Sequence, residues 1–128
     1  MRIIATGTFD VQLNPCPAEL DGAVNRFNMT KTFKGDLQGN GIGVMLSCGN
    51  PQLGSAGYVV LETVRGQLGN RQGAFALQQY ATMHDGSQIL YYDVVPGSGE
   101  GDLNGITGKF RLTIDADGTH NYELEYDL

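Results

Sequence analysis

The sequence has no tryptophan and little proline or cysteine, with four and two residues in 128. It also has no cluster of lysine or arginine, and its formal net charge is −6. Nucleic acids and anionic membrane surfaces are recognised by basic patches, so neither is an expected partner. No apolar run approaches the roughly 20 residues of a membrane-spanning helix, and the N-terminus lacks the apolar core of a signal peptide. We therefore expect a cytoplasmic protein of the bacterial type.

The sequence also lacks the spacings that hold metals and phosphates. Cys16 and Cys48 form no Cys-x-x-Cys motif and lie far from both histidines, which offers no zinc site. A disulfide between them stays open, although a cytosolic chain disfavours it. The acidic run 115–117 has too few ligands for a calcium loop. The glycine-rich run 97–101 lacks the lysine and the following helix of a phosphate loop. We expect neither a metal nor a cofactor.

Glycine is abundant, with 19 residues, and it separates runs rich in Val, Ile, Thr, Tyr and Phe. This pattern predicts short strands joined by tight turns. The strand-like runs are 3–13, 25–34, 39–48, 56–68, 72–83, 88–96, 108–115 and 119–128. Mostly short connections predict an antiparallel meander, and closing it into a barrel removes the exposed edge strands. We predict an all-β, eight-stranded, antiparallel up-and-down barrel that forms a single domain over residues 1–128.

Several stretches carry a resemblance to a known family. They are Thr6–Phe9, Lys31–Gly39, Gly43–Ser47, Gly54–Glu62, Gly73–Gln78, Val95–Ile106 and His120–Tyr126. The chain resembles a bacterial family catalogued as domain of unknown function 3224, which is similar in structure to the allene oxide cyclase barrel. The resemblance covers nearly the whole chain. It implies an eight-stranded barrel with an interior cavity, assembled as a homo-oligomer, and it implies no particular activity.

Two ionisable residues lie on apolar faces of the expected strands. Side chains alternate between the two faces of a strand. Lys31 therefore shares a face with Phe and Met residues of the run 27–33, and Glu62 shares one with Tyr and Val residues of the run 58–64. A lone buried charge costs several kcal/mol unless it is paired or neutralised. The two residues therefore face water, pair with each other, or line a cavity with a function.

Three further residues are candidates for the same cavity. His120 opens the last expected strand on the face of Tyr122, where a histidine near a cavity mouth can carry protons. A strand-end histidine with a satisfied hydrogen bond is the alternative. Tyr58 and Tyr122 are candidate walls for an apolar ligand, although aromatic residues on strands mostly form core. The candidate ligand-binding residues are Lys31, Tyr58, Glu62, His120 and Tyr122, and Glu62 is also the candidate catalytic residue.

These residues support three hypotheses about function. The first is binding of a small, mainly apolar molecule in the barrel, with Lys31, Glu62 and His120 as polar anchors. The second is a cyclase- or isomerase-like enzyme in which Glu62 stabilises positive charge or moves a proton. The third is a packed structural or interaction barrel. The first two need a cavity above about 300 Å³ with convergent polar groups. A register shift of one residue would turn Lys31 and Glu62 outward, so the sequence leaves the choice open.

Overall fold

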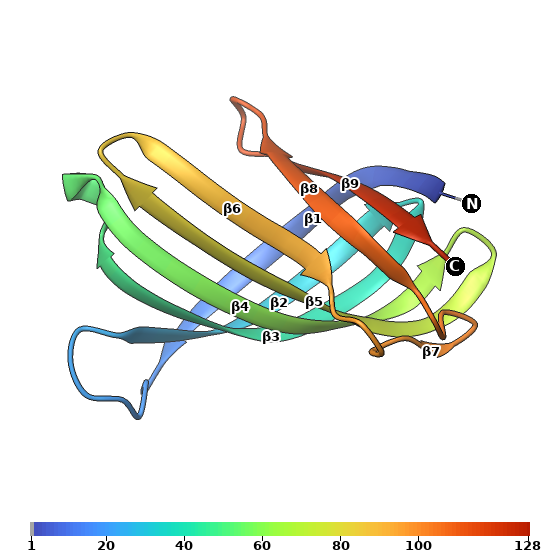
Figure 1. Cartoon of the computed structure of the whole chain (residues 1–128), viewed down its shortest axis with the longest axis horizontal. Helices are drawn as coiled ribbons and strands as arrows, with labels where there is room; N and C mark the ends of the chain where they lie inside the picture. The colour runs from blue at the N-terminus through green and yellow to red at the C-terminus, as the bar shows by residue number, and fades with distance from the viewer. Residues whose placement is uncertain (1) are drawn as a thin grey trace.

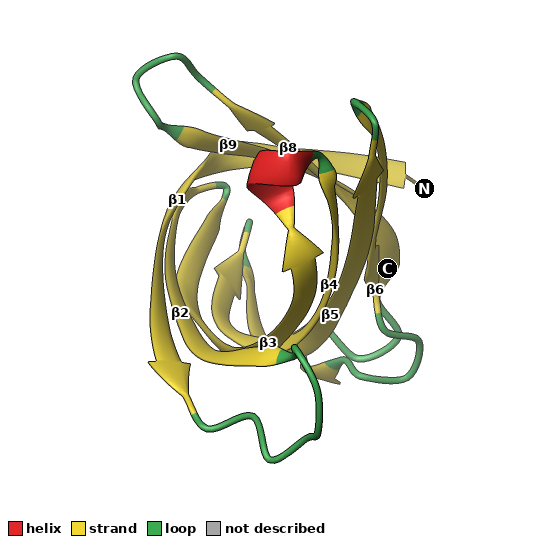
Figure 2. Ribbon diagram, turned by 90° about the vertical axis from the view of Figure 1, so that its left-hand side faces the viewer, coloured by secondary structure: helices red, strands yellow, loops and turns green. Residues whose placement is uncertain are grey.

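The strands of the chain wrap around a common interior, as a computed structural model describing residues 2–128 shows (Figure 1 and Figure 2). The strands are β1 (Arg2–Cys16), β2 (Asn25–Gly35), β3 (Leu37–Asn50), β4 (Ser55–Leu68), β5 (Arg71–His84), β6 (Ser87–Val94), β7 (Glu100–Gly101), β8 (Thr107–Ile114) and β9 (His120–Asp127). All pairings between them are antiparallel. The predicted eight-stranded antiparallel barrel is confirmed, with β7 as one extra strand.

The barrel is an up-and-down meander that closes on itself. Strands β1 to β6 pair in sequence order, β8 pairs with β6 and β9, and β9 returns to β1. The β1–β9 closure runs from the pair Arg2–Asp127 to the pair Phe9–His120. By contrast, the described part of β6 meets β8 at a single pair, Asp93–Lys109. The barrel wall is therefore least continuous at the β6–β8 seam.

Two features lie outside the predicted strand pattern. Strand β7 falls within the long connection expected to be irregular, and it pairs with Gly73 and Ala74 of β5. A Cβ atom at Gly73 would lie 2.1 Å from the carbonyl oxygen of Glu100, so only glycine lets the two backbones approach this closely. A single 3₁₀ turn, Pro51–Leu53, joins β3 to β4 and is capped by the side chain of Asn50.

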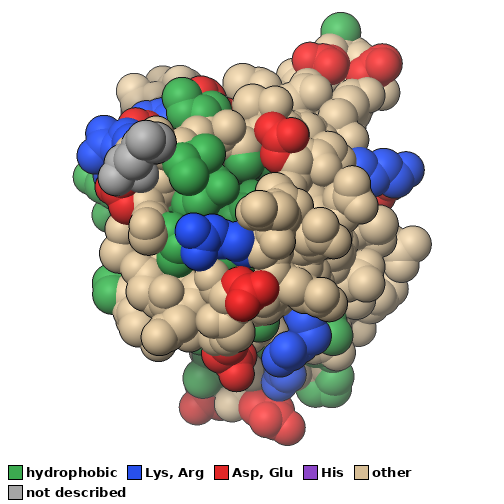
Figure 3. Space-filling model, turned by 90° about the vertical axis from the view of Figure 1, so that its right-hand side faces the viewer, with side chains coloured by type: hydrophobic (Ala, Val, Ile, Leu, Met, Phe, Trp, Pro, Cys, Tyr) green, Lys and Arg blue, Asp and Glu red, His purple; other side chains and the backbone are tan. Residues whose placement is uncertain are grey.

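The two ends of the barrel differ. At the end that holds the chain termini, the segment 95–106 folds over the interior, and five fully buried side chains fill the space beneath it: Leu37, Leu68, Phe75, Leu103 and Ile106. The surface of this end is covered, with acidic and basic side chains interspersed (Figure 3). We call it the closed end.

At the opposite end, several side chains on the inner face of the wall remain exposed to solvent. Leu13, Leu90 and Ile114 are 43%, 44% and 60% exposed, respectively. Their cross-strand partners are Met29, Ala81 and His120, all on inward-facing positions. We call this end, visible in Figure 2, the open end.

The closed end is secured by the hydroxyl of Tyr122. It accepts a hydrogen bond from the backbone N–H of Leu37 at 3.0 Å and donates to the carbonyl oxygen of Lys34 at 2.8 Å. These contacts attach β9 to the turn between β2 and β3. Gly7 makes them possible, because a Cβ atom there would lie 2.5 Å from the Tyr122 hydroxyl.

The two cysteines do not form a disulfide. Cys16 is partly buried and Cys48 is exposed, and both thiols are free. Cys48 lies on the outer face of β3, at the position that pairs with Gly57 of β4. Within residues 2–128, no helix has the length and apolar character needed to cross a membrane.

Candidate functional site

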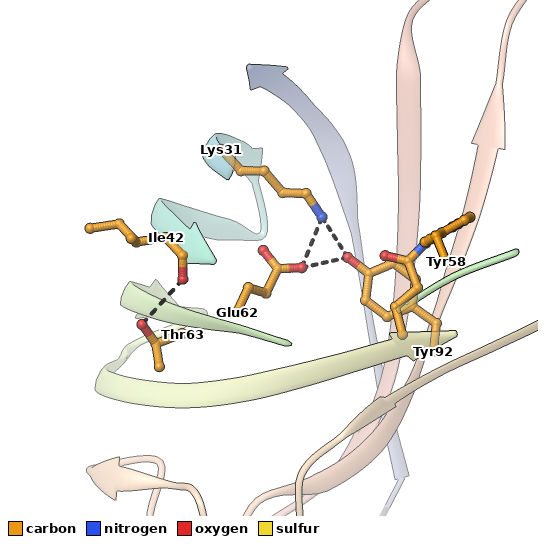
Figure 4. Close-up of polar contacts among 7 residues, drawn as sticks. Lys31, Ile42, Tyr58, Glu62, Thr63 and Tyr92 are labelled. Carbon is orange, nitrogen blue, oxygen red and sulfur yellow. Dashed lines mark hydrogen bonds and ion pairs between the residues drawn. The ribbon is translucent and has the colours of Figure 1, made fainter. Parts of the chain in front are cut away.

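A buried cluster of one lysine, one glutamate and one tyrosine lies inside the barrel. The ammonium Nζ of Lys31 on β2 donates to Glu62 Oε1 on β4 at 2.8 Å and to the hydroxyl oxygen of Tyr92 on β6 at 2.6 Å. The Tyr92 hydroxyl in turn donates to Glu62 Oε1 at 2.7 Å. These three contacts close a triangle that links strands on different sides of the barrel (Figure 4). We call it the ionic centre.

Strand register explains why these side chains meet. Lys31 pairs across the sheet with Gly41, and Gly43 pairs with Glu62. A Cβ atom at Gly41 would lie 2.9 Å from Glu62 Oε2, and one at Gly43 would lie 2.7 Å from the Cβ atom of Glu62. The two glycines of β3 therefore leave the space that the glutamate occupies between β2 and β4.

The centre is almost completely removed from solvent. Lys31, Glu62 and Tyr92 are 5%, 1% and 4% exposed. Burial lowers the pKa of the Lys31 ammonium below its usual value, and the nearby Glu62 carboxylate offsets part of this shift. The ring of Phe9 adds a cation–π contact, with its centroid 4.6 Å from Lys31 Nζ. The ammonium is thus held by three different groups.

One oxygen of the centre is left without a partner. Glu62 Oε2 is buried and has no hydrogen-bond partner among the described residues. A carboxylate oxygen in such surroundings gains from any donor that reaches it, because the buried acceptor has otherwise lost its water. The centre can therefore accept one further hydrogen bond.

A second polar pair lies between the ionic centre and the open end. The amide nitrogen of Gln79 donates to the hydroxyl of Tyr58 at 2.6 Å, and Gln79 is 8% exposed. Tyr58 is half-buried and lies beside Tyr92 in Figure 4. The pair places a hydroxyl and an amide on an inner wall that is otherwise apolar, next to Val60 and Met29.

The structure unites some of the predicted site residues and separates others. Lys31 and Glu62 pair inside the barrel and are buried, so of the three alternatives left by the sequence the one in which they face water is wrong. His120 is half-buried and stacks edge-on against Phe9 at 5.1 Å, so it approaches the centre through that ring. Tyr122 uses its hydroxyl at the closed end, and its ring packs on Phe33 and Phe110.

Sequence reasoning missed three members of the site. Tyr91 and Tyr92 point to opposite faces of their strand, so only one of them can lie inside the barrel. The sequence of this strand does not indicate which face is the inner one, and Tyr92 could therefore not be chosen over Tyr91. Gln79 and Phe9 were not singled out. The signal for Gln79 was a polar residue on the face of β5 that carries Phe75 and Leu77.

We expect Tyr92 to be the last tyrosine to ionise. Burial and then the Glu62 carboxylate raise the pKa of its phenol well above 10.0. An unfolded tyrosine loses its proton near pH ~10. Above that pH the folded chain holds a proton that the unfolded chain has lost, so this contribution to stability falls as pH rises.

An alkaline titration monitored by tyrosinate absorbance tests this expectation. In the wild type, one ionisation should accompany loss of the fold as seen by circular dichroism, and Tyr92→Phe should remove it. Tyr91→Phe, at the exposed neighbouring position, is the control that keeps it. A late ionisation that survives in Tyr92→Phe would contradict the assignment.

The described residues 2–128 contain no group of three or more His, Cys, Asp or Glu side chains arranged to hold a metal ion. The site brings together an ammonium, a carboxylate and a phenol. They can hold a polar group of a bound molecule, exclude water from it and move a proton between oxygen and nitrogen atoms.

Fold and site together define a closed antiparallel β-barrel built around a buried lysine–glutamate–tyrosine centre. The family model described as "Protein of unknown function (DUF3224)" matches residues 5–126. A solved structure of a DUF3224-family protein of unknown function from Shewanella oneidensis MR-1 is 40% identical and has a TM-score of 0.93. The match covers 100% of this chain and 98% of that chain. The chain belongs to the DUF3224 family, which confirms the resemblance seen in the sequence. A search of curated proteins found no match.

Proposed function

We propose that the barrel binds a small, mainly apolar molecule that enters from the open end and places one hydrogen-bond donor on Glu62. The observation that carries this proposal is the unpartnered Oε2 atom of Glu62 in an otherwise fully bonded buried centre. Retaining two charges in a barrel interior is costly, since apolar residues of the same volume would often stabilise the fold equally well. A binding role gives the centre a use beyond stability.

The walls above the centre suit an apolar ligand. Between the ionic centre and the open end, the inner face carries Met29, Val60 and the partly exposed Leu90. Tyr58 and Gln79 supply the few polar groups that would orient a ligand. Lys31 already donates to Glu62 and Tyr92, so it would hold Glu62 in place and balance its charge. His120 would act through Phe9 rather than by direct contact.

Replacing Glu62 by glutamine tests the proposal. The side-chain oxygen would remain on Lys31 and Tyr92, which places an NH₂ donor where Oε2 now accepts. A hydrogen bond to a charged group contributes about 1.5 to 3 kcal/mol, so we expect ligand retention to fall about 10- to 100-fold. Native mass spectrometry of freshly purified protein measures retained mass, and Glu100→Gln, an exposed site with a 69% exposed side chain, is the matched control.

A defined probe keeps the test independent of the folding of that variant. β-Naphthol is apolar and carries one hydroxyl donor, whereas its methyl ether has the same rings and no donor. Titration of the wild type should show β-naphthol binding at least about 10-fold more tightly than the ether. Equal affinities, or no binding of either compound at about 1 mM, would contradict the proposal.

An enzyme that rearranges or cyclises such a molecule is the second candidate. It is favoured by the contact of a phenol, a carboxylate and an ammonium in one dry cluster, where proton transfer and stabilisation of positive charge are both effective. The molecule released from denatured protein separates the two. If wild-type protein leaves it chemically unchanged, binding alone is supported; if wild type converts it and Glu62→Gln does not, the enzyme is supported.

The net charge of −6 and the absence of a basic cluster in the sequence support the remaining parts of this proposal. They disfavour nucleic acid and anionic membranes as partners.

A further inference from the structure

The outer surface of the barrel carries an extended apolar area. Its members point outward from four neighbouring strands. Those more than a third exposed are Ile42 (67%), Val59 (50%), Leu61 (58%), Tyr80 (47%), Ile89 (52%) and Tyr91 (51%). Val44 and Leu46 of β3 lie between them and are half-buried. We call this area on β3, β4, β5 and β6 the apolar outer face.

Register makes these residues contiguous. Leu46 pairs with Val59 on β4, Val59 pairs with Tyr80 on β5, and Tyr80 pairs with Tyr91 on β6. The rings of Tyr80 and Tyr91 stack at 4.9 Å with an interplanar angle of 13°. A groove of about 560 Å³ runs beside them and is lined by Val44 and Leu61 among others. The residues therefore form one surface rather than scattered single side chains.

The outer surface of the strands that flank this face has the opposite character. The outward positions of β2 carry Arg26, Asn28, Thr30, Thr32 and Lys34. Charged pairs on β8 and β9, such as Arg111 with Glu125 at 3.1 Å, continue this polar wall. Strands with one face in the core and one in water normally alternate apolar inner residues with polar outer residues. The apolar outer face departs from this pattern and needs a separate explanation.

We propose that the apolar outer face is covered by a second copy of this chain, related by a two-fold axis. The six residues that are more than a third exposed present roughly 650 Å² of surface, taking about 200 Å² for a fully exposed side chain of this size. The largest apolar patch on a typical monomer is about 300 to 600 Å², and a stable interface covers about 800 Å² per partner. The face is thus large for a monomer and close to what a dimer needs.

The face carries no charge that would oppose an identical partner. Each copy has a net charge of −6, and contact through an uncharged surface keeps the like charges of the two copies apart. The named residues of the face are all uncharged, and a two-fold axis brings the same apolar surface to both sides. Asp93, at the border of the groove, is already paired with Lys109 at 3.7 Å.

Sedimentation equilibrium of the wild type and two variants tests this inference. The wild type should have twice the chain mass of 13.8 kDa at micromolar concentration. Leu61→Asp would bury two like charges near each other, so the dimer dissociation constant should rise at least about 100-fold. Gln12→Asp introduces the same charge at an exposed outward position of β1, which β2 separates from β3, and it should leave the mass unchanged. Circular dichroism shows whether each variant is folded.

The result can also overturn the inference. A wild type that remains a monomer at about 100 µM would do so, since an interface of this size is expected to associate at that concentration. An oligomer that Gln12→Asp dissociates and Leu61→Asp leaves intact would place the contact away from the apolar outer face. Should Leu61→Asp fail to fold, Tyr80→Ser removes apolar area without adding a charge and should weaken the dimer in the same direction.

Discussion

A Lys31→Met variant is expected to be about 3 to 5 kcal/mol less stable than the wild type in urea unfolding. Methionine keeps the volume of the lysine stem but removes the ammonium that balances Glu62. The carboxylate would then remain buried, with the Tyr92 hydroxyl as its only donor among the contacts described above. The cation–π contact with Phe9 is lost as well. Glu62→Gln should show a loss in the same direction, because it leaves the ammonium without a counter-charge.

The double variant Lys31→Met/Glu62→Gln is the informative comparison. With both charges gone, no unbalanced charge remains, and most of the lost stability should return. Its unfolding free energy should therefore lie well above that of either single variant. Additive losses in the double variant would contradict strong coupling and would mean that Lys31 and Glu62 contribute separately. A recovered double variant that has also lost ligand retention would separate the binding role of the centre from its role in stability.

Gly7→Ala is expected to lower stability by about 3 kcal/mol, or the melting temperature by about 10 °C. The new Cβ atom would lie 2.0 Å from the carbonyl oxygen of Lys34 and 2.5 Å from the hydroxyl of Tyr122. The carbonyl oxygen belongs to the backbone of the neighbouring strand and also accepts the Tyr122 hydrogen bond. Relief of the clash must therefore separate β1 from β2 or break the contact that secures the closed end.

Gly57→Ala is the matched control for this prediction. It is also a glycine within a strand, but the nearest atom to its added Cβ would be the carbonyl oxygen of Ala81 at 3.5 Å, an ordinary contact. Alanine there should be neutral or stabilise the protein by about 0.4 to 1 kcal/mol, since it restricts the unfolded chain. Thermal unfolding followed by circular dichroism compares the two. Equal melting temperatures would show that β1 accommodates the Cβ atom at Gly7 without strain.

Local sequence patterns predicted the fold correctly because each barrel strand carries its own signal. Alternating Val, Ile, Thr and aromatic residues mark the strands, and glycine-containing turns such as Asp117–Gly118 separate them. Strand β7 was missed because two residues are too few to show alternation. Its pairing depends instead on the close approach that Gly73 permits on β5.

The candidate site was only partly accessible in the same way. Lys31 and Glu62 could be identified from the sequence because each is a charged residue on an otherwise apolar strand face. Recognising this needs only the residues of the same strand and not the position of any partner. A tyrosine is an ordinary residue in a β-strand, so the sequence around Tyr92 does not identify it as a site residue. Its role appears only when β6 closes against the opposite side of the barrel.

The sequence by itself determined the strand pattern, the turns and the two ionisable residues that require a buried partner or water, because these follow from short-range periodicity and from the cost of an unpaired charge. Tertiary structure decided which faces point inward, that Lys31 and Glu62 meet each other and Tyr92, and that Glu62 Oε2 is left without a partner. It also placed the apolar residues of β3 to β6 in one continuous outer face. These features depend on register between strands far apart in the sequence, and a shift of one residue would reverse every one of them.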